Sequence, residues 1–248
     1  MLAKRVIPLL LTYGGRLVKG ERYDSRRVVG HAQQATRVHQ MRGVDELIIF
    51  DVAATHEGFG PDLNSISRIT EGCFMPITVG GGVRTLEHIR DLLRAGADKV
   101  AICSAAADDH EFVYEASRRF GAQAIVVVIE TTASRQVTTH NGRQAYVEYD
   151  ALGYARLLEH LGAGELVLSS VDRDGTMQGY DLDLLHEIAY SVDIPVVACG
   201  GAGNYQHMLE AIQAGASAVA AGAMFQWTDA TPRGAVEYLH QHNVPVRL

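Results

Sequence analysis

Glycine pairs occur twice in the sequence at the ends of apolar runs, and a second pair of small residues follows the next run each time, in an arrangement suited to holding an oxyanion. Glycine has no Cβ, so backbone N–H groups can approach a phosphate closely. Together with a glycine of the segment DRDGT, the predicted phosphate-binding residues are Gly81, Gly82, Cys103, Ser104, Gly175, Gly200, Gly201, Gly222 and Ala223. The first site keeps the hydroxyl of Ser104, whereas Ala223 leaves the second site with backbone donors alone. The alternative interpretation is that these glycines only form tight turns.

The segment Asp172–Thr176, which reads DRDGT, places a carboxylate where a strand ends. It follows the apolar run Glu165–Ser169. In a barrel of parallel strands, a side chain at the carboxyl end of a strand faces the active-site mouth. Asp174 is therefore predicted to orient a ligand hydroxyl or to assist proton transfer, and the alternative is a polar turn that caps the next helix.

Charged residues stand at the opposite ends of four apolar runs, where the runs begin: Arg5, Glu46, Lys99 and Glu165. This layer of a barrel is usually filled by Val or Leu, and burying charge there is unfavourable unless the charges are paired. Two interpretations stand. The four residues form either a ring of ion pairs that only stabilises the barrel, or a plug across its axis that serves a function.

Short apolar runs that alternate with helical patterns must position these groups. Their near-continuous content of Val, Ile, Leu and Ala is typical of strands buried on both faces. The eight runs are Arg5–Leu11, Glu46–Asp51, Pro76–Val79, Lys99–Cys103, Ala124–Ile129, Glu165–Ser169, Pro195–Ala198 and Ala218–Gly222. Eight such units in about 250 residues have the size of one (β/α)8 barrel, so we predict an α/β fold with a single TIM-barrel domain over residues 1–248.

Local signals predict several helix starts and one inserted hairpin. The predicted N-caps are Thr85, Asp109 and Thr231. The segment Thr131–Asp150 follows the fifth run and contains Asn141-Gly142 between two short arms. Because both residues of this pair tolerate a positive φ, we predict a β-hairpin after the fifth strand, above the mouth of the barrel.

The sequence repeats itself at an offset of 119 residues. PITVGGGVRTLEHIRDLLRAGADKVA aligns without a gap on PVVACGGAGNYQHMLEAIQAGASAVA, and the same offset places Glu46 on Glu165 and Leu11 on Glu130. A constant offset over three regions indicates two half-barrels related by an approximate twofold axis. Such a barrel offers two similar anion sites across one mouth, which suits a substrate with a phosphate at each end.

The composition disfavours several classes of protein. Of 248 residues, 47% are hydrophobic and 21% are charged, the balance of an ordinary soluble chain. No apolar run reaches the ~18 residues of a membrane span, the start has no signal-peptide cleavage site, and a net charge of −7 disfavours general nucleic-acid binding. Cys73, Cys103 and Cys199 are too widely spaced for a disulfide framework or a zinc site. We therefore expect a cytoplasmic protein with no metal, no cofactor, and no membrane or nucleic-acid partner.

Over its full length the chain resembles the cyclase subunit of imidazole glycerol phosphate synthase. The resemblance rests on Lys19 and on the segments LAKRVIP, DELIIFDV, TVGGGV, RAGADKV, GAGEL, DRDGT with GYD following, and GGAG. It implies a glutaminase subunit that binds the N-terminal face of the barrel as a heterodimer. Ammonia released there would pass through the barrel to a phosphorylated small molecule at the C-terminal mouth. The residues that match the family's ammonia gate are Arg5, Glu46, Lys99 and Glu165.

The resemblance also implies a catalytic set from which this chain departs. Two aspartates act as general acid and base in the family. The first aligns with Leu11, which cannot transfer a proton, and the second aligns with Glu130. Glutamate displaces its carboxylate by about one C–C bond, and an error near 1 Å can slow catalysis about 100-fold. An asparagine of the first phosphate site is Cys103 here. The predicted catalytic residues are Glu130, Lys19, Asp51 and Asp174.

Other segments resemble a divergent branch of the family that works with a glutaminase in surface-polysaccharide biosynthesis. They include the LLL of the first strand, GCFMPI, TLEH, GTMQGYDL, PVVACGGAG and ASAVAAG. That branch is thought to deliver ammonia to acetamido sugars. A different substrate of this kind would explain why Leu11 stands where the family has a catalytic aspartate. The leading hypothesis is an ammonia-adding synthase subunit that acts on a phosphorylated sugar-type substrate in amidino-sugar synthesis. The alternatives are an authentic cyclase of histidine biosynthesis and a non-catalytic subunit that binds an anion and activates its partner.

Overall fold

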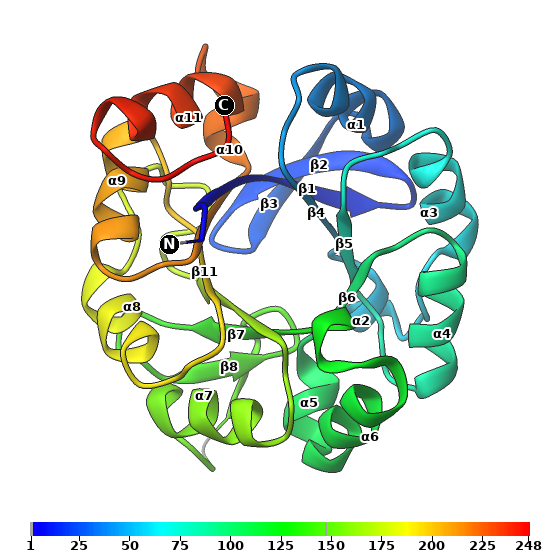
Figure 1. Ribbon diagram of the computed structural model, residues 1–248. Helices are drawn as coiled ribbons and strands as arrows, with labels where there is room; N and C mark the ends of the chain where they lie inside the picture. Colours follow the sequence, from blue (N-terminus) through cyan, green and yellow to red (C-terminus); the bar gives the residue numbers. More distant parts are fainter. Residues whose placement is uncertain (1, 147) are drawn as a thin grey trace.

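The computed structural model describes residues 2–146 and 148–248. Within these ranges, eight parallel strands form a closed barrel surrounded by helices (Figure 1). The barrel strands are β1 (Arg5–Tyr13), β4 (Leu47–Asp51), β5 (Ile77–Gly80), β6 (Lys99–Ile102), β7 (Ile125–Thr131), β10 (Glu165–Ser170), β11 (Val196–Cys199) and β12 (Ala218–Ala221). The pairing of β1 with β12 and of β7 with β10 closes the ring in chain order. The predicted (β/α)8 barrel is confirmed.

Helices cover the outside of the barrel and follow the strands in the predicted alternation. They are α1 (Ala32–Met41), α2 (Ala54–Glu57), α3 (Leu63–Thr70), α4 (Leu86–Arg94), α5 (Ser104–Asp108), α6 (His110–Phe120), α7 (Ala151–His160), α8 (Leu182–Ala189), α9 (Tyr205–Gln213), α10 (Ala223–Trp227) and α11 (Pro232–Gln241). The predicted N-caps are confirmed, because the side chains of Thr85, Asp109 and Thr231 accept hydrogen bonds from the first turns of their helices. No helix in the described ranges combines the length and apolar character needed to cross a bilayer.

Alternation along the strands divides the apolar side chains between two layers. On β1, Ile7 and Leu9 point into the barrel, whereas Val6 and Leu10 pack against the helices. The inner layer consists of small and medium-sized side chains: Ile7, Leu9, Ile48, Ala101, Val126, Val128, Val167, Val197, Cys199, Ala218 and Ala220. This buried apolar layer separates the two ends of the barrel, where the polar residues lie.

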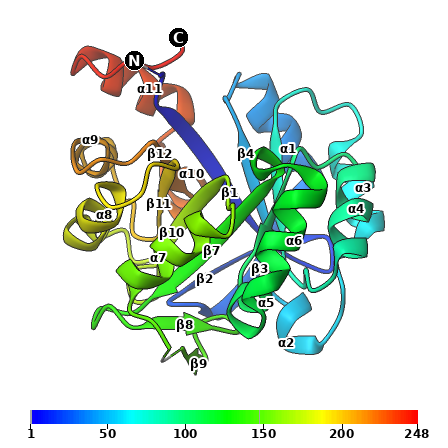
Figure 2. The same ribbon diagram turned by 60° about the horizontal axis from the view of Figure 1, so that its bottom comes forward.

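Antiparallel hairpins follow two of the barrel strands and lie at the end of the barrel opposite the chain termini (Figure 2). They are β2 (Arg16–Glu21) with β3 (Asp24–His31) after β1, and β8 (Val137–Thr139) with β9 (Gln144–Ala145) after β7. The second hairpin is the predicted one, and Asn141 and Gly142 at its tip have positive φ values of 61° and 74°. The first is not predicted from the sequence. Residue 147, inside the predicted insertion, lies outside the described residues.

The offset of 119 residues relates elements that have the same role in the two halves. The strands β1, β4, β5 and β6 correspond to β7, β10, β11 and β12, and each half carries a hairpin after its first strand. Asp62 and Asp181, related by the offset, cap α3 and α8. His88 and His207 each accept, through Nδ1, the backbone N–H of the residue four positions earlier. The structure thus repeats along with the sequence, and these two histidines hold loops at the carboxyl end of the barrel.

Candidate functional site

A pocket opens at the carboxyl end of the barrel, where both hairpins contribute to its wall. Its apolar wall includes Leu9, Leu11, Phe50 and Val128. Its polar wall includes Tyr23, Asp51, Asn141, Glu130, Ser169 and Asp174. Three of the four predicted catalytic residues therefore share one pocket. The fourth, Lys19, precedes Gly20, which also lines the pocket.

Glu130 lies near the end of β7 and is only 5% exposed. Its Oε2 accepts the backbone N–H of Gly142 at 3.0 Å, and its carboxylate accepts a hydrogen bond from the thiol of Cys103. Burial, together with the charge of Glu130, raises the pKa of Cys103 well above its usual range, so the thiol stays protonated and remains a donor. These two donors orient the carboxylate, whereas Leu11, related to Glu130 by the repeat, adds only an apolar surface to the same pocket.

Lys19 lies on β2 and is 3% exposed. Burial lowers its pKa to about 8, although the nearby carboxylate of Asp174 acts in the opposite direction. Its Nζ lies against Gly222, where a Cβ would approach that atom to 2.1 Å. The second predicted phosphate site is therefore built differently from the expectation of backbone donors alone. A buried amine reaches the loop between β12 and α10, next to Ala223.

Asp51 ends the strand β4, whereas Asp174 lies in the loop after β10, on a different side of the pocket. The Oδ1 of Asp51 accepts the backbone N–H groups of Ala53 and Ala54 at 2.9 and 3.3 Å. Burial nevertheless raises the pKa of Asp51 above its usual value, because it outweighs these hydrogen bonds. The backbone carbonyl of Asp174 accepts the N–H of Arg22 at 2.9 Å, so the DRDGT loop is joined to the tip of the first hairpin.

Glycine is required where this loop meets the hairpin. Gly175 has a φ of 72°, and a Cβ there would lie 2.4 Å from the carbonyl oxygen of Gly20. Gly175 therefore serves close packing of two backbones at the rim of the pocket, which is the tight-turn alternative raised for the predicted phosphate-binding glycines.

Tyr23 is a residue of the pocket that the sequence analysis missed. It lies at the tip of the first hairpin with Arg22, and both have positive φ values, 62° and 51°. Its hydroxyl lies 2.8 Å from Oγ of Ser169, which pairs in register with Glu130. Burial and the charge of Glu130 raise the pKa of Tyr23, so the phenol remains a potential donor. No pattern in the polar segment around Tyr23 indicates this position.

The first predicted phosphate site forms a second pocket beside the mouth. Gly81 and Gly82 have φ values of 113° and 68°, and Cβ atoms there would lie 2.4 and 2.6 Å from the carbonyl oxygens of Asp51 and Phe59. Ser104 begins α5 and lines the same pocket, and its Oγ accepts the backbone N–H of His140 at 2.9 Å. The second hairpin thus reaches this site as well as Glu130.

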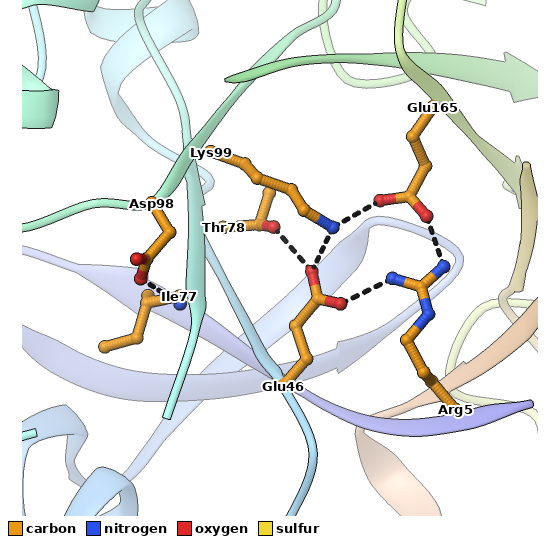
Figure 3. Close-up of polar contacts among 7 residues, drawn as sticks. All are labelled: Arg5, Glu46, Ile77, Thr78, Asp98, Lys99 and Glu165. Carbon is orange, nitrogen blue, oxygen red and sulfur yellow. Dashed lines mark hydrogen bonds and ion pairs between the residues drawn. The ribbon is translucent and has the colours of Figure 1, made fainter. Parts of the chain in front are cut away.

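The four predicted gate residues meet at the amino end of the barrel in a closed ring (Figure 3). Arg5 donates to Glu46 at 2.5 Å and also to Glu165. Lys99 contacts the same two carboxylates at 2.9 and 2.8 Å. Burial alone would raise the pKa of Glu46, but Lys99 and Arg5 outweigh it and lower that pKa below its usual value. Glu46 is therefore held as a carboxylate beneath the apolar interior, and Thr78 Oγ1 also donates to it at 3.0 Å.

The arrangement thus consists of a charged ring, an apolar interior and a polar mouth along one axis. A family model described as histidine biosynthesis protein matches residues 5–230. The chain belongs to the histidine biosynthesis protein family. This family of enzymes includes isomerases and cyclases built on the same barrel. In this member of the histidine biosynthesis family, the mouth keeps three predicted carboxylates within one pocket, and the predicted phosphate-binding residues divide between the site beside Ser104 and the loops near Lys19.

Proposed function

We propose that this chain is the ammonia-accepting synthase subunit of a glutamine-dependent amidotransferase that acts on a phosphorylated sugar-type substrate. The observation that carries the proposal is the ring of Arg5, Glu46, Lys99 and Glu165, which lies on the barrel axis opposite the mouth. The ring and the pocket stand at the two ends of one apolar interior, which is the arrangement that delivery of a small molecule from one end to the other requires.

The interior between ring and mouth suits a small neutral molecule. Its side chains are apolar, and three of them, Ala101, Ala218 and Ala220, are no larger than a methyl group. An ammonium ion would lose its hydration in such surroundings, whereas uncharged ammonia loses far less. Passage past the ring requires one of its four ion pairs to open, so the ring acts as the gate.

The surface around the ring supports a partner subunit at the amino end. Leu2, Met41 and Phe74 are each at least 87% exposed, and each lies just before β1, β4 or β5 or on the helix that leads to it. A partner docked at this end of the barrel would remove these apolar side chains from water. We assign this surface to a glutaminase subunit that releases ammonia directly above the ring.

The mouth favours a specialised substrate over the histidine-pathway intermediate. Leu11 removes one of the two proton-transfer groups of the cyclases, and Glu130 carries its carboxylate further from the strand than aspartate does. A role in amidino-sugar synthesis for surface polysaccharides accounts for both changes, with Glu130 as the proton-transfer group. An authentic cyclase remains the second candidate, favoured by Lys19, Asp51 and Asp174. A non-catalytic activating subunit is the third, favoured by Leu11.

Turnover of the isolated chain with an ammonium salt tests the chemistry of the mouth. With the phosphorylated intermediate of the histidine pathway as substrate, we expect slow turnover that rises in a Leu11→Asp variant, because the variant restores a proton-transfer group. Turnover by the unmodified chain at the rate of an authentic cyclase would contradict the specialised role. Turnover that Glu130→Gln leaves unchanged at saturating ammonia would contradict the role of Glu130.

Reconstitution with the glutaminase subunit encoded in the same genome tests the partnership. We expect a one-to-one complex by size-exclusion chromatography and a rise in glutamine hydrolysis when the chain is added. Lys99→Met should impair glutamine-driven turnover more than ammonium-driven turnover. Lys4→Met, which removes a cation at the same end but outside the ring, is the matched control. Absence of a complex, together with unchanged glutamine hydrolysis, would refute the proposal.

A further inference from the structure

The pocket beside the mouth carries an ionisable side chain that the sequence analysis did not assign to any site. Its wall combines the glycine turn after β5, the start of α5 and the tip of the second hairpin. The residues used in the argument are Gly81, Gly82, Arg84, Ser104, Asp108 and His140. The hairpin therefore brings a histidine to the pocket that the glycine turn also lines.

Arg84 shapes this pocket through its hydrogen bonds. Its guanidinium donates to the carbonyl oxygens of Gly58 and Ala54 at 3.2 and 3.3 Å, and to those of Thr55 and Phe59 at 3.4 Å. These contacts fold the segment around α2 over the pocket. Arg84 contributes positive charge to the wall, but its N–H groups are directed at the backbone, so recognition of an anion falls to other donors.

The backbone of His140 is held by several contacts. Its φ is 55°, and its N–H donates to Oγ of Ser104 at 2.9 Å. The next two residues are also fixed, because Nδ2 of Asn141 donates to the carbonyl oxygen of Val52 at 3.0 Å and the N–H of Gly142 donates to Glu130. The hairpin tip thus connects the first phosphate site to the carboxylate of the mouth.

The imidazole of His140 lies between Thr139 of its own hairpin and Asp108, another residue of the pocket wall. Nδ1 lies 3.0 Å from Oγ1 of Thr139, which leaves Nε2 as the nitrogen available to a ligand. Nε2 lies 3.9 Å from the carboxylate of Asp108, whose side chain is 63% exposed. The exposed aspartate can stay in solvent when an anion takes its place at Nε2.

We propose that His140 is a ligand of the substrate's phosphate-type group and completes the first anion site. The group sits between the turn of Gly81 and Gly82 and the hydroxyl of Ser104, and Nε2 of His140 donates to it from the hairpin side. The tip of the same hairpin donates to Glu130 through Gly142, so the phosphate ligand and the proton-transfer group share one support. The inference rests on the proposed function only in taking the anion to be part of the substrate.

Titration of the full chain with inorganic phosphate tests the inference. His140→Asn removes the imidazole while keeping a residue type that tolerates a positive φ, so the hairpin and its backbone N–H donor are retained. We expect phosphate affinity, measured by calorimetry, to fall about tenfold, as for loss of one charge-assisted hydrogen bond. His56→Asn is the matched control, because His56 is an exposed histidine on α2 next to the pocket. Its affinity should remain within about twofold of the unmodified chain.

A second measurement avoids any dependence on the variant's folding. In the unmodified chain, phosphate should shift the imidazole nitrogen signals of His140 in NMR spectra and leave those of His56 in place. No phosphate binding by the unmodified chain, equal affinity in His140→Asn, or an unshifted His140 signal at saturating phosphate would each overturn the inference. Because these measurements use neither ammonia nor glutaminase, their failure is distinct from failure of the amidotransferase proposal.

Discussion

The two half-barrels share a skeleton and differ in the residues that do chemistry. Glu46 and Glu165 occupy equivalent positions and both accept hydrogen bonds from the same two cations. Those cations, Arg5 and Lys99, both come from the first half, and the equivalent positions of the second half hold Ala124 and Ala218. The repeat therefore preserved turns, helix caps and the two acids, whereas the charges that balance them are found in one half only.

At the mouth of the barrel, too, the two halves share a backbone arrangement and differ in their functional residues. Each half presents a hairpin and a glycine turn, but Ser104 faces an open pocket in the first half, whereas the equivalent residue in the second half is Ala223, beside the amine of Lys19. The first hairpin buries a charged residue, while the strand β8 of the second buries Val137 and two threonines. The two halves thus have similar backbones, but residue differences between them give the mouth two unlike anion sites.

Removing one acid of the ring should produce the largest effect on stability. Glu46→Gln leaves Arg5 and Lys99 without a full countercharge and is expected to lower the free energy of unfolding by roughly 3–5 kcal/mol. Glu165→Gln should cost less, because Glu165 lacks the extra hydrogen bond that Thr78 gives to Glu46. Urea unfolding measures both, with exposed Glu87→Gln as control. A larger loss of unfolding free energy in Glu165→Gln than in Glu46→Gln would show that the hydrogen bond from Thr78 does not decide which acid contributes more.

Lys19 predicts a pH dependence that the second half lacks. Its folded pKa of about 8 lies below the value near 10.5 of an unfolded lysine, so the unfolded chain binds more protons between these values. The contribution of Lys19 to stability should therefore rise from pH 8 toward pH 10.5. Relative to the unmodified chain, Lys19→Met should be more stable at pH 7, with an advantage that shrinks by about 2–3 kcal/mol at pH 10. Arg94→Met, an exposed change of charge, should show no such change in chemical unfolding, and a constant advantage for Lys19→Met would contradict the prediction.

Helices α1 and α7 give a comparison at one buried position. His39 of α1 is equivalent to Leu158 of α7, and burial lowers its pKa to about 4. In the unfolded chain the imidazole of His39 becomes protonated near pH 6.5, so its contribution to stability should fall as the pH drops from 6.5 toward 4. His39→Leu should remove this loss. Its free energy of unfolding relative to that of the unmodified chain should rise by about 2 kcal/mol when the pH is lowered from 7.5 to 4.5. His160→Leu, at an exposed site, is the control, and parallel pH curves for His39→Leu and the unmodified chain would argue against the assignment.

The smallest effect is expected at the first hairpin. Tyr23→Phe removes the hydrogen bond to Ser169 and should lower stability by about 1 kcal/mol. Tyr13→Phe removes an exposed hydrogen bond to Glu57 and should change stability by less than about 0.5 kcal/mol. The single tryptophan, Trp227, has Arg27 of the same hairpin 5.2 Å from its ring, so its fluorescence reports whether the hairpin has moved. Equal losses in the two tyrosine variants would show that Tyr23 does not fasten the hairpin.

Strands, helix caps and one hairpin could be predicted because their signals are local. Apolar runs gave the eight barrel strands, and Asn141-Gly142 is a pair that favours a positive φ. The first hairpin escaped prediction because its strands carry charged residues and its tip, Arg22 with Tyr23, uses residue types that rarely take a positive φ. Its tip is held by contacts with Asp174 and Ser169, which are distant in sequence.

The candidate site also has one part that could be predicted from the sequence and another that could not. The ring could be predicted because alternation places Arg5, Ile7 and Leu9 on one side of β1, and because the resemblance named all four members. The contact of Lys19 with Gly222 and the approach of His140 to Ser104 depend on how the hairpins fold over the mouth. Such contacts join residues far apart in the chain, and no local pattern contains them.

The unequal origin of the ring's charges has a consequence for assembly. A barrel built from two copies of the second half would bring two glutamates together at its base with no cation, and one built from two copies of the first half would hold twice as many cations as acids. Only unlike halves neutralise each other there. The neutrality of the ring thus depends on the difference between the two halves, because the two cations of the first half balance one acid from each half.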